Sequence, residues 1–359
     1  MDFNNIQPLP VVCRQSSIKC AVACERCWFY KHRMRARLRG VEYKEAATLG
    51  KIYHRLQQYG PGKESETKKW VAQQQRKLMD RVQRGEDLDG NMTRLANQLT
   101  TLYNKAEVMA HVFWERFPQP EHFKVIGTEI KHSMKYNGLI IEGTIDKLIL
   151  HTKDKPEPSV WIRDHKNTGR PLAVIFGGLP WSIQARIYRL LAEDYHANHV
   201  INPYQIRGFI LDGIITPGIK LCKTDEKNAK DWNCSVEDAY LRRVKEWYRD
   251  YEIKADLGGK KNTKAIDSRG ILYTEPEIPP ELERILAWMQ ELHSRPLHPE
   301  YFHRDVTRMA CFQYEKQCIY HDLCETDPTQ WDSLFETKYQ IKPVEDNENE
   351  EEDSEDNSM

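Results

Sequence analysis

The sequence Leu139-Ile-Ile-Glu-Gly-Thr-Ile-Asp146, followed by Ser159-Val-Trp-Ile-Arg-Asp-His-Lys166, decides the fold. Each stretch contains a run of three apolar residues, Leu139-Ile-Ile141 and Val160-Trp-Ile162, and each stretch predicts a β-strand. Neighbouring strands would bring Asp146 and Asp164 side by side. Lys166 lies two residues after Asp164, and the two-residue period of a strand turns both side chains toward the same face. One face of the predicted sheet therefore carries two carboxylates and a lysine.

These side chains suit the cleavage of a phosphodiester. Such cleavage places negative charge on the phosphate oxygens, and a divalent metal ion neutralises that charge and activates water. Hard ions such as Mg²⁺ bind carboxylate oxygens, so Asp146 and Asp164 are candidate ligands. Lys166 would orient the attacking water or hold the scissile phosphate. The alternative is that Asp146 opens a turn and that Asp164 and Lys166 form a solvated surface pair, but the joint spacing favours a site.

The order Gly-x-x-Asp, Asp-x-Lys and Gln-x-x-x-Tyr resembles the RecB-like branch of the PD-(D/E)XK nucleases. The motifs here are Gly143 to Asp146, Asp164 to Lys166, and Gln184 to Tyr188. The segment Leu49 to Leu56 resembles the early helix of that branch, whose histidine joins the metal shell, and Glu129 lies on a strand where the family often has an acid. The resemblance implies metal binding by His54, Asp146 and Asp164, catalysis by Asp146, Asp164, Lys166 and Glu129, and DNA contact by Gln184 and Tyr188.

The residues alone leave alternatives open for the helical members of this set. A single histidine on a helix is more often a packed or surface side chain than a ligand, and His111 competes with His54 for the role. Gln184 and Tyr188 are four residues apart in a helical pattern, so they share one flank. The other interpretation makes Tyr188 a core residue and Gln184 a residue at the rim.

Nine cysteines fall at three places in the chain. The sequence shows neither a secretory signal nor a long apolar run, so we expect a cytoplasmic protein, in the host cytoplasm if it is viral. Disulfides are disfavoured in that compartment, so the favoured hypothesis is that the cysteines bind a metal ion or a metal cluster. The late trio has the spacing Cys-x₆-Cys-x₅-Cys and needs a fourth ligand from elsewhere.

The opening segment, in which basic and aromatic residues follow Cys24, resembles an iron–sulfur subgroup of the RecB-like branch. CRISPR-associated, recombinational-repair and phage-type exonucleases are the relatives this suggests. The resemblance implies a [4Fe–4S] cluster with one early and three late ligands, Cys24, Cys311, Cys318 and Cys324, and with Cys27 in reserve. Two alternatives stay open, namely structural Zn²⁺ bound by four of these thiolates, and reduced thiols without a metal.

Charge is distributed unevenly along the 359 residues. The formal net charge is −1, but residues 344–359 contain nine acidic residues and no lysine or arginine, which leaves +8 on residues 1–343. The acidic tail has almost no apolar residues to offset chain entropy, so it is predicted to be disordered. A basic body suits DNA. Arg33 and Arg35, on a predicted basic helix, are expected to contact DNA, although a charge run is more often a solvated face.

The order of elements predicts an α/β fold of the PD-(D/E)XK, restriction-endonuclease-like type. Its mixed central sheet would be flanked by helices, with a helical N-terminal elaboration and a C-terminal cysteine segment. Strands are expected at about 123–133, 139–150, 159–165 and 205–215. The expected regions are a helical N-terminal region with the first cluster cysteine (1–115), the nuclease core (116–260), a C-terminal helix and cysteine segment packing back on the core (261–343), and the disordered tail (344–359).

Together these features predict a metal-dependent DNA exonuclease that uses Mg²⁺ or Mn²⁺ and acts on single strands or duplex ends. Recombination, repair or phage DNA processing is the expected setting. The sequence has no glycine-rich phosphate loop, so unwinding would need a helicase or recombination partner protein. The alternatives are a non-catalytic DNA-binding subunit of a repair or recombination complex, and a zinc-stabilised nucleic-acid-binding module. No membrane association is expected.

Overall fold

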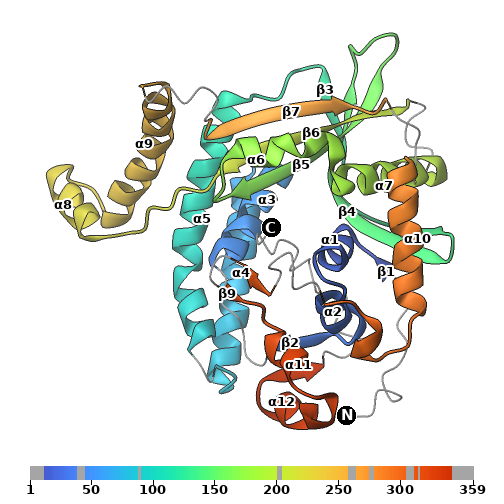
Figure 1. Cartoon of the computed structure of the whole chain (residues 1–359). Helices are drawn as coiled ribbons and strands as arrows, with labels where there is room; N and C mark the ends of the chain where they lie inside the picture. The colour runs from blue at the N-terminus through green and yellow to red at the C-terminus, as the bar shows by residue number, and fades with distance from the viewer. Residues whose placement is uncertain are drawn as a thin grey trace.

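A mixed sheet runs through the middle of the molecule, with helices on both of its faces (Figure 1). The computed structural model describes residues 12–38, 45–87, 90–199, 204–257, 264–274, 279–304, 311–313 and 316–341. Within these ranges the sheet has six strands, β1 (Val12–Cys13), β3 (Phe123–Tyr136), β4 (Leu139–His151), β5 (Ser159–Thr168), β6 (Ile206–Ile215) and β7 (Ile266–Leu272). The predicted α/β fold with a mixed central sheet is confirmed.

Strand β4 organises the sheet. Strand β3 runs antiparallel along one edge of β4, and β5 runs antiparallel along the other edge. Strand β1 is parallel to the start of β4, where it pairs with Ile140 and Ile141. Strand β6 is parallel to β5, and β7 is antiparallel to β6. Strands β4 and β5 are therefore interior strands, and every residue in them is buried or half-buried.

Two sets of helices cover the two faces of the sheet. One core forms between the sheet and four helices, α1 (Gln15–Ala23), α2 (Glu25–Trp28), α7 (Ile183–His199) and α10 (Pro280–Ser294). The other core includes Ile214 and Ile266 of the sheet and four further helices, α3 (Glu45–Tyr59), α4 (Glu64–Gln83), α5 (Asn91–Arg116) and α9 (Val236–Leu257). The predicted N-terminal region 1–115 is thus divided between the two faces.

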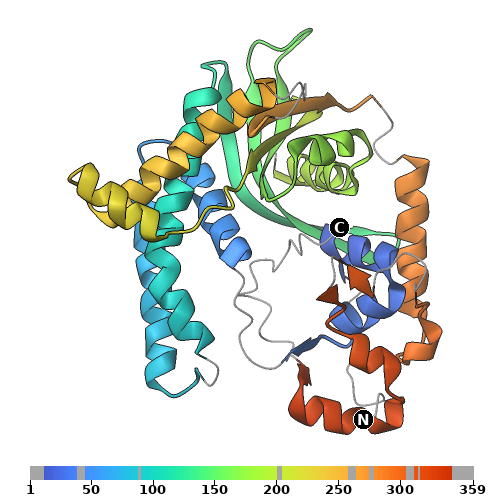
Figure 2. The same cartoon turned by 60° about the vertical axis from the view of Figure 1, so that its left-hand side comes forward.

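The beginning and the end of the described chain pack against each other (Figures 1 and 2). Strand β2 (Ala36–Leu38) pairs antiparallel with β10 (Tyr339–Ile341). The π-helical turn η2 (Phe29–Arg33) supplies Phe29, whose ring stacks on Phe302 at 4.5 Å, and Tyr30, whose ring packs against Trp331 at 5.5 Å. Helices α11 (His321–Glu325) and α12 (Trp331–Thr337) complete this end of the molecule.

The shorter elements fill the connections between these layers. They are α6 (Leu172–Gly177), η3 (Leu179–Trp181), α8 (Lys223–Asp231), η4 (Pro299–Tyr301), β8 (Phe312–Gln313), β9 (Lys316–Gln317) and η5 (Pro328–Gln330). The predicted acidic tail, residues 344–359, lies outside the described residues. Among the helices that are described, none is long and apolar enough to cross a membrane.

Candidate active site

The carboxylates of Asp146 and Asp164 meet on neighbouring strands. Lys147 of β4 pairs with Arg163 of β5 in the antiparallel register, so the next residues along the two strands, Asp146 and Asp164, stand opposite each other. The backbone N–H of His165 donates to Asp146 Oδ2 at 2.9 Å, which ties the strands together at this point. The pairing of β4 with β5 therefore sets the spacing of the two acids.

His54 of α3 reaches the same point from the helical layer. Its Nδ1 lies 3.2 Å from Asp146 Oδ2. Burial raises the pKa of Asp146, but the charge and hydrogen bond of His54, with the charges of His165 and Lys166, outweigh burial and hold that pKa well below its usual range. Asp146 is therefore an anion. The competing histidine, His111, lies beside Glu64 at 3.4 Å instead.

Gly50 allows α3 to approach β5 closely enough for this contact. A Cβ atom at Gly50 would lie 3.1 Å from the side-chain oxygen of Asn167 on β5, tighter than an ordinary contact. His54 follows one helical turn later, so it lies on the same side of α3. Gly50 thus lets α3 lie close to β5, and His54, four residues later, reaches the carboxylate of Asp146.

Asp164 is held by two polar side chains from different elements. It is 1% exposed, Gln184 Nε2 of α7 donates to its Oδ1 at 3.0 Å, and Lys166 Nζ lies 3.5 Å from its Oδ2. The strand period had predicted that Asp164 and Lys166 share a face, and this distance agrees. The site combines an imidazole, two carboxylates, an amide and an ammonium group.

Gly143 lets α7 lie against β4. A Cβ atom there would be 3.0 Å from Leu191 Cδ1 and 3.4 Å from Tyr188 Cε1. Tyr188 is 5% exposed and its ring also faces Phe209, while Gln184 is 6% exposed. In the structure Gln184 hydrogen-bonds a carboxylate and Tyr188 packs in the core, and DNA contact by these two side chains stays a prediction.

Arg33 and Arg35, which were predicted to contact DNA, are both buried. The basic stretch is not a surface helix, because helical structure ends at Arg33 and the chain enters β2 at Ala36. The two arginines are 7% and 8% exposed, and Arg33 Nη2 donates to the carbonyl oxygen of His293 at 3.2 Å. Burial lowers the pKa of Arg33. Arg33 contributes to the packing between the start of the chain and α10.

Glu129 lies at an irregular position of β3. Its neighbours Thr128 and Ile130 pair with Lys147 and Ile145, so in register it stands opposite Asp146. Its φ of 48° is outside the strand region, so the two-residue alternation does not set the direction of its side chain. It stays a predicted catalytic residue that the fold places on the strand next to Asp146.

A buried charged network beneath the site escaped the sequence reasoning. Asp212 of β6 is 1% exposed and accepts from Arg163 Nε at 2.5 Å and from Ser268 Oγ at 2.6 Å, and His165 Nδ1 lies 3.0 Å away. Arg163 and His165 flank Asp164 and point to the opposite face of β5. The available signal was the single acid within the apolar run 206–215.

Lys147 is another buried charged residue, next to Asp146 on β4. Its ammonium group donates to the carbonyl oxygen of Gln57 on α3. Burial, and then the charge of Arg163, lowers the pKa of Lys147 to about 8. This lysine joins α3 to β4 one residue after Asp146, so it helps to hold the helix that carries His54.

The predicted metal ligands have suitable chemistry. Carboxylate oxygens and an imidazole nitrogen are donors that Mg²⁺ or Mn²⁺ accepts. Within the described ranges, however, no group of three or more histidine, cysteine, aspartate or glutamate side chains is arranged to hold a metal ion. Such an ion would bind carboxylate oxygens of Asp146 and Asp164. Asp146 Oδ2 already lies beside His54, and Asp164 Oδ2 lies beside Lys166, so a cation would compete with these two ion pairs.

Cysteines from both ends of the chain come together. Cys20 Sγ lies 3.7 Å from Cys27 Sγ, and the pKa of Cys27 is raised well above its usual value, first by Cys20, while Cys318 acts in the opposite direction. Burial raises the pKa of Cys324 to about 12, and the charges of Cys318 and Cys24 add to this. The thiols of α1 and α2 therefore lie within electrostatic range of those near α11.

Cys311 approaches this group through its backbone. It is buried, and its carbonyl oxygen accepts from the backbone N–H of Cys318 at 2.8 Å. The cysteines within the described residues are free rather than disulfide-bonded. Of the predicted cluster ligands, Cys24 and Cys318 both affect the pKa of Cys324, and Cys20, which was not predicted, lies beside Cys27.

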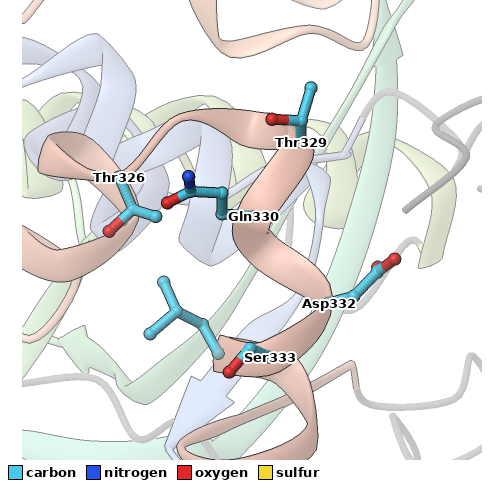
Figure 3. A pocket seen from close by; sticks show the side chains of 6 residues that line it. Thr326, Thr329, Gln330, Asp332 and Ser333 are labelled. Atoms are coloured by element: carbon cyan, nitrogen blue, oxygen red, sulfur yellow. The ribbon is translucent and has the colours of Figure 1, made fainter.

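A separate pocket in the C-terminal segment contains none of the predicted site residues (Figure 3). Its six lining residues are Thr326, Thr329, Gln330, Asp332, Ser333 and Leu334. They come from a single stretch of chain around η5 and α12, so the pocket is the concave side of one local turn. No catalytic group lies among them.

A mixed sheet that carries two facing carboxylates, with a lysine and a helical histidine beside them, places the protein among the nucleases with an α/β core. The model of the PD-(D/E)XK nuclease superfamily matches residues 15–325, and the chain belongs to this superfamily. A solved structure from Eubacterium rectale, described as a "putative exonuclease", is similar with a TM-score of 0.38 and 12% identity, over 89% of this chain and 96% of that chain. Comparison with curated proteins found no match.

Proposed function

We propose that this protein is a metal-dependent DNA exonuclease of the RecB-like branch. The observation that carries the proposal is the contact of His54 with Asp146, 3.2 Å from Nδ1 to Oδ2, at the point where Asp164 and Lys166 face each other. A histidine from the early helix, two strand carboxylates and the strand lysine are the set that this branch uses. Recombination, repair or phage DNA processing is the proposed setting.

Each residue of the site has a distinct role in this proposal. His54, Asp146 and Asp164 would hold Mg²⁺ or Mn²⁺, which supplies charge neutralisation and an acidified water when bound. Lys166 holds a positive charge beside the reacting phosphate, where it orients water or the scissile group. Gln184 fixes the carboxylate of Asp164 through its hydrogen bond to Oδ1, and Lys166 lies beside Oδ2. Glu129 is the remaining proposed catalytic acid.

Digestion of matched DNA substrates tests this function. With Mg²⁺ or Mn²⁺ the protein should degrade linear DNA and leave covalently closed circular DNA intact, because an exonuclease needs an end. EDTA should stop the reaction and added Mn²⁺ should restore it. Equal cleavage of linear and circular DNA would contradict an exonuclease. Binding of DNA without cleavage, in the presence of either metal, would favour the non-catalytic DNA-binding subunit.

A [4Fe–4S] cluster held by Cys24, Cys311, Cys318 and Cys324 is the second part of the proposal. The proximity of early and late thiols supports it, and the two short backbone spans that carry them would then be tied together by the cluster. The alternative is that the same thiols bind structural Zn²⁺.

Metal analysis of the purified protein separates these possibilities. We expect iron and a brown colour in the unmodified protein, and loss of iron in Cys24→Ser. Cys222→Ser is the matched control, because Cys222 is exposed at the start of α8 and belongs to no cysteine group. Zinc in a colourless protein would replace the iron–sulfur assignment. Absence of both metals would support reduced thiols without a metal.

Partner proteins remain a prediction of the sequence. In this proposal a helicase or recombination protein supplies the nuclease with single strands. Co-purification of such a partner with the tagged protein, dependent on DNA ends, is the result expected.

A further inference from the structure

We propose that Trp181 stacks on an unpaired base of the DNA strand next to the catalytic carboxylates, and so gives the enzyme a preference for single-stranded ends. This inference rests on the proposed nuclease function and deepens it. Trp181 belongs to η3, the short turn between α6 and α7. It is 69% exposed, the largest fraction among the large hydrophobic side chains of the described residues. An indole in this position is an open aromatic surface.

The connection that carries Trp181 starts and ends in the active site. It leaves β5 after Thr168, two residues beyond Lys166, and it ends at Gln184, which hydrogen-bonds Asp164. Trp181 is three residues before Gln184, so their Cα atoms are at most about 11 Å apart. A strand whose phosphate lies at the carboxylates would therefore place a base at Trp181 within about one to three nucleotides of the cleaved bond.

The charge of this connection suits a nucleic acid. Residues 169–186 include two arginines, Arg170 and Arg186, and no acidic residue. The guanidinium carbon of Arg186 lies 5.9 Å from the centre of the Trp181 ring. Positive charge combined with an aromatic surface is the usual arrangement for binding single strands, because phosphates meet the cations while bases stack on the ring.

The backbone presents the indole from an anchored turn. Leu179 is 3% exposed, and the N–H of Trp181 donates to the carbonyl oxygen of Gly178 at 3.1 Å. Helix α6 is fixed upstream by Phe176, which packs over Gly213 of β6 so closely that a Cβ atom there would meet its ring at 3.0 Å. A ring on a rigid turn loses little conformational freedom when a base stacks on it.

A preference between DNA forms follows from this geometry. Bases inside a duplex are already stacked and paired, so they can stack on Trp181 only at the cost of leaving the duplex stack. A base in a single strand, or in a frayed end, can stack on the ring directly. The exposed indole therefore selects strands that are already unpaired near the cleaved bond.

Binding of a labelled single-stranded oligonucleotide, measured in EDTA so that no cleavage occurs, tests the proposal. Trp181→Ala should weaken binding by about 5- to 150-fold, which corresponds to the loss of one stacked base. Trp181→Phe should restore most of the affinity. Trp232→Ala is the matched control, because Trp232 is also exposed and lies 5.6 Å from Arg242, but at the junction of α8 and α9. It should bind like the unmodified protein.

Oligonucleotides that carry one abasic position near the end identify the stacked base. At one position, the abasic change should weaken binding to the unmodified protein as much as Trp181→Ala weakens binding of the intact oligonucleotide. The same abasic change should not weaken binding to Trp181→Ala any further, because the two changes remove the same contact. Losses that add at every position would overturn the proposal, as would a Trp181→Ala protein that binds normally. If that variant still cleaves linear DNA, the nuclease function stands without it. If the unmodified protein neither binds nor cleaves DNA, the proposed function fails and takes this inference with it.

Discussion

Asp164→Asn is expected to lower the rate of DNA cleavage by about 10³-fold or more while the fold is retained. The amide keeps the shape of the buried side chain, and its oxygen can still accept the hydrogen bond from Gln184, which is 3.0 Å long in the unmodified protein. It removes the negative charge that would hold the metal ion and that faces Lys166 at 3.5 Å. Loss of about 4 kcal/mol of charge stabilisation in the transition state corresponds to that rate change.

The measurement is the initial rate on linear DNA with Mn²⁺, alongside thermal unfolding of the same samples. Asp194→Asn provides the matched control, because Asp194 is another aspartate held by a polar side chain, 2.7 Å from His132, but at the far part of α7. Its cleavage rate should be unchanged. Lys166→Ala should also be inactive. Full activity in both Asp164→Asn and Lys166→Ala would show that cleavage occurs elsewhere on the protein.

Asp212→Ala is expected to lower the free energy of unfolding by about 3–5 kcal/mol at neutral pH. The carboxylate is 1% exposed and is the partner of Arg163, so its removal leaves a buried guanidinium without its counter-charge. Burial raises the pKa of Asp212, but the charges and hydrogen bonds of Arg163 and His165 outweigh it and keep the pKa well below its usual range. Asp212 is therefore ionised in the folded protein at neutral pH.

Urea unfolding gives the free energy, and two further variants test the cause. Glu115→Ala breaks an exposed pair with Lys245, and its effect should stay below about 1 kcal/mol. The double variant Arg163→Met with Asp212→Leu should recover much of the loss, because it removes the unpaired charge together with its partner. A stability of Asp212→Ala equal to that of the unmodified protein would mean that solvent reaches Arg163 and compensates it.

Cleavage should fall together with stability in Asp212→Ala. Arg163 and His165 lie on either side of Asp164, and the backbone of His165 also donates to Asp146. A shift of β5 at these residues would therefore move both carboxylates. The buried network and the candidate site lie on opposite faces of β5, so we expect Asp212 to affect cleavage although it is not proposed to contact substrate.

The sequence by itself determined the strands and the motif. Alternation along β5 placed Asp164 and Lys166 on one face, and the facing of Asp146 and Asp164 followed from two adjacent strands. Short-range periodicity carries this information, because the direction of a side chain within a strand depends on the parity of its position. The spacing from Gly50 to His54 pointed to the histidine that lies beside Asp146 for the same kind of reason, since both lie on one side of a helix.

Only the tertiary structure decided what each of those faces meets. Tyr188, Arg33 and Arg35 carry polar groups at plausible surface positions, yet α7 buries the tyrosine on β4, and the packing against α10 buries Arg33. The partners of Asp212 lie on β5 and β7, and the thiols that gather around Cys27 come from opposite ends of the chain. Periodicity describes one element at a time, whereas burial and charge pairing depend on contacts between elements far apart in the chain, for which no local pattern exists.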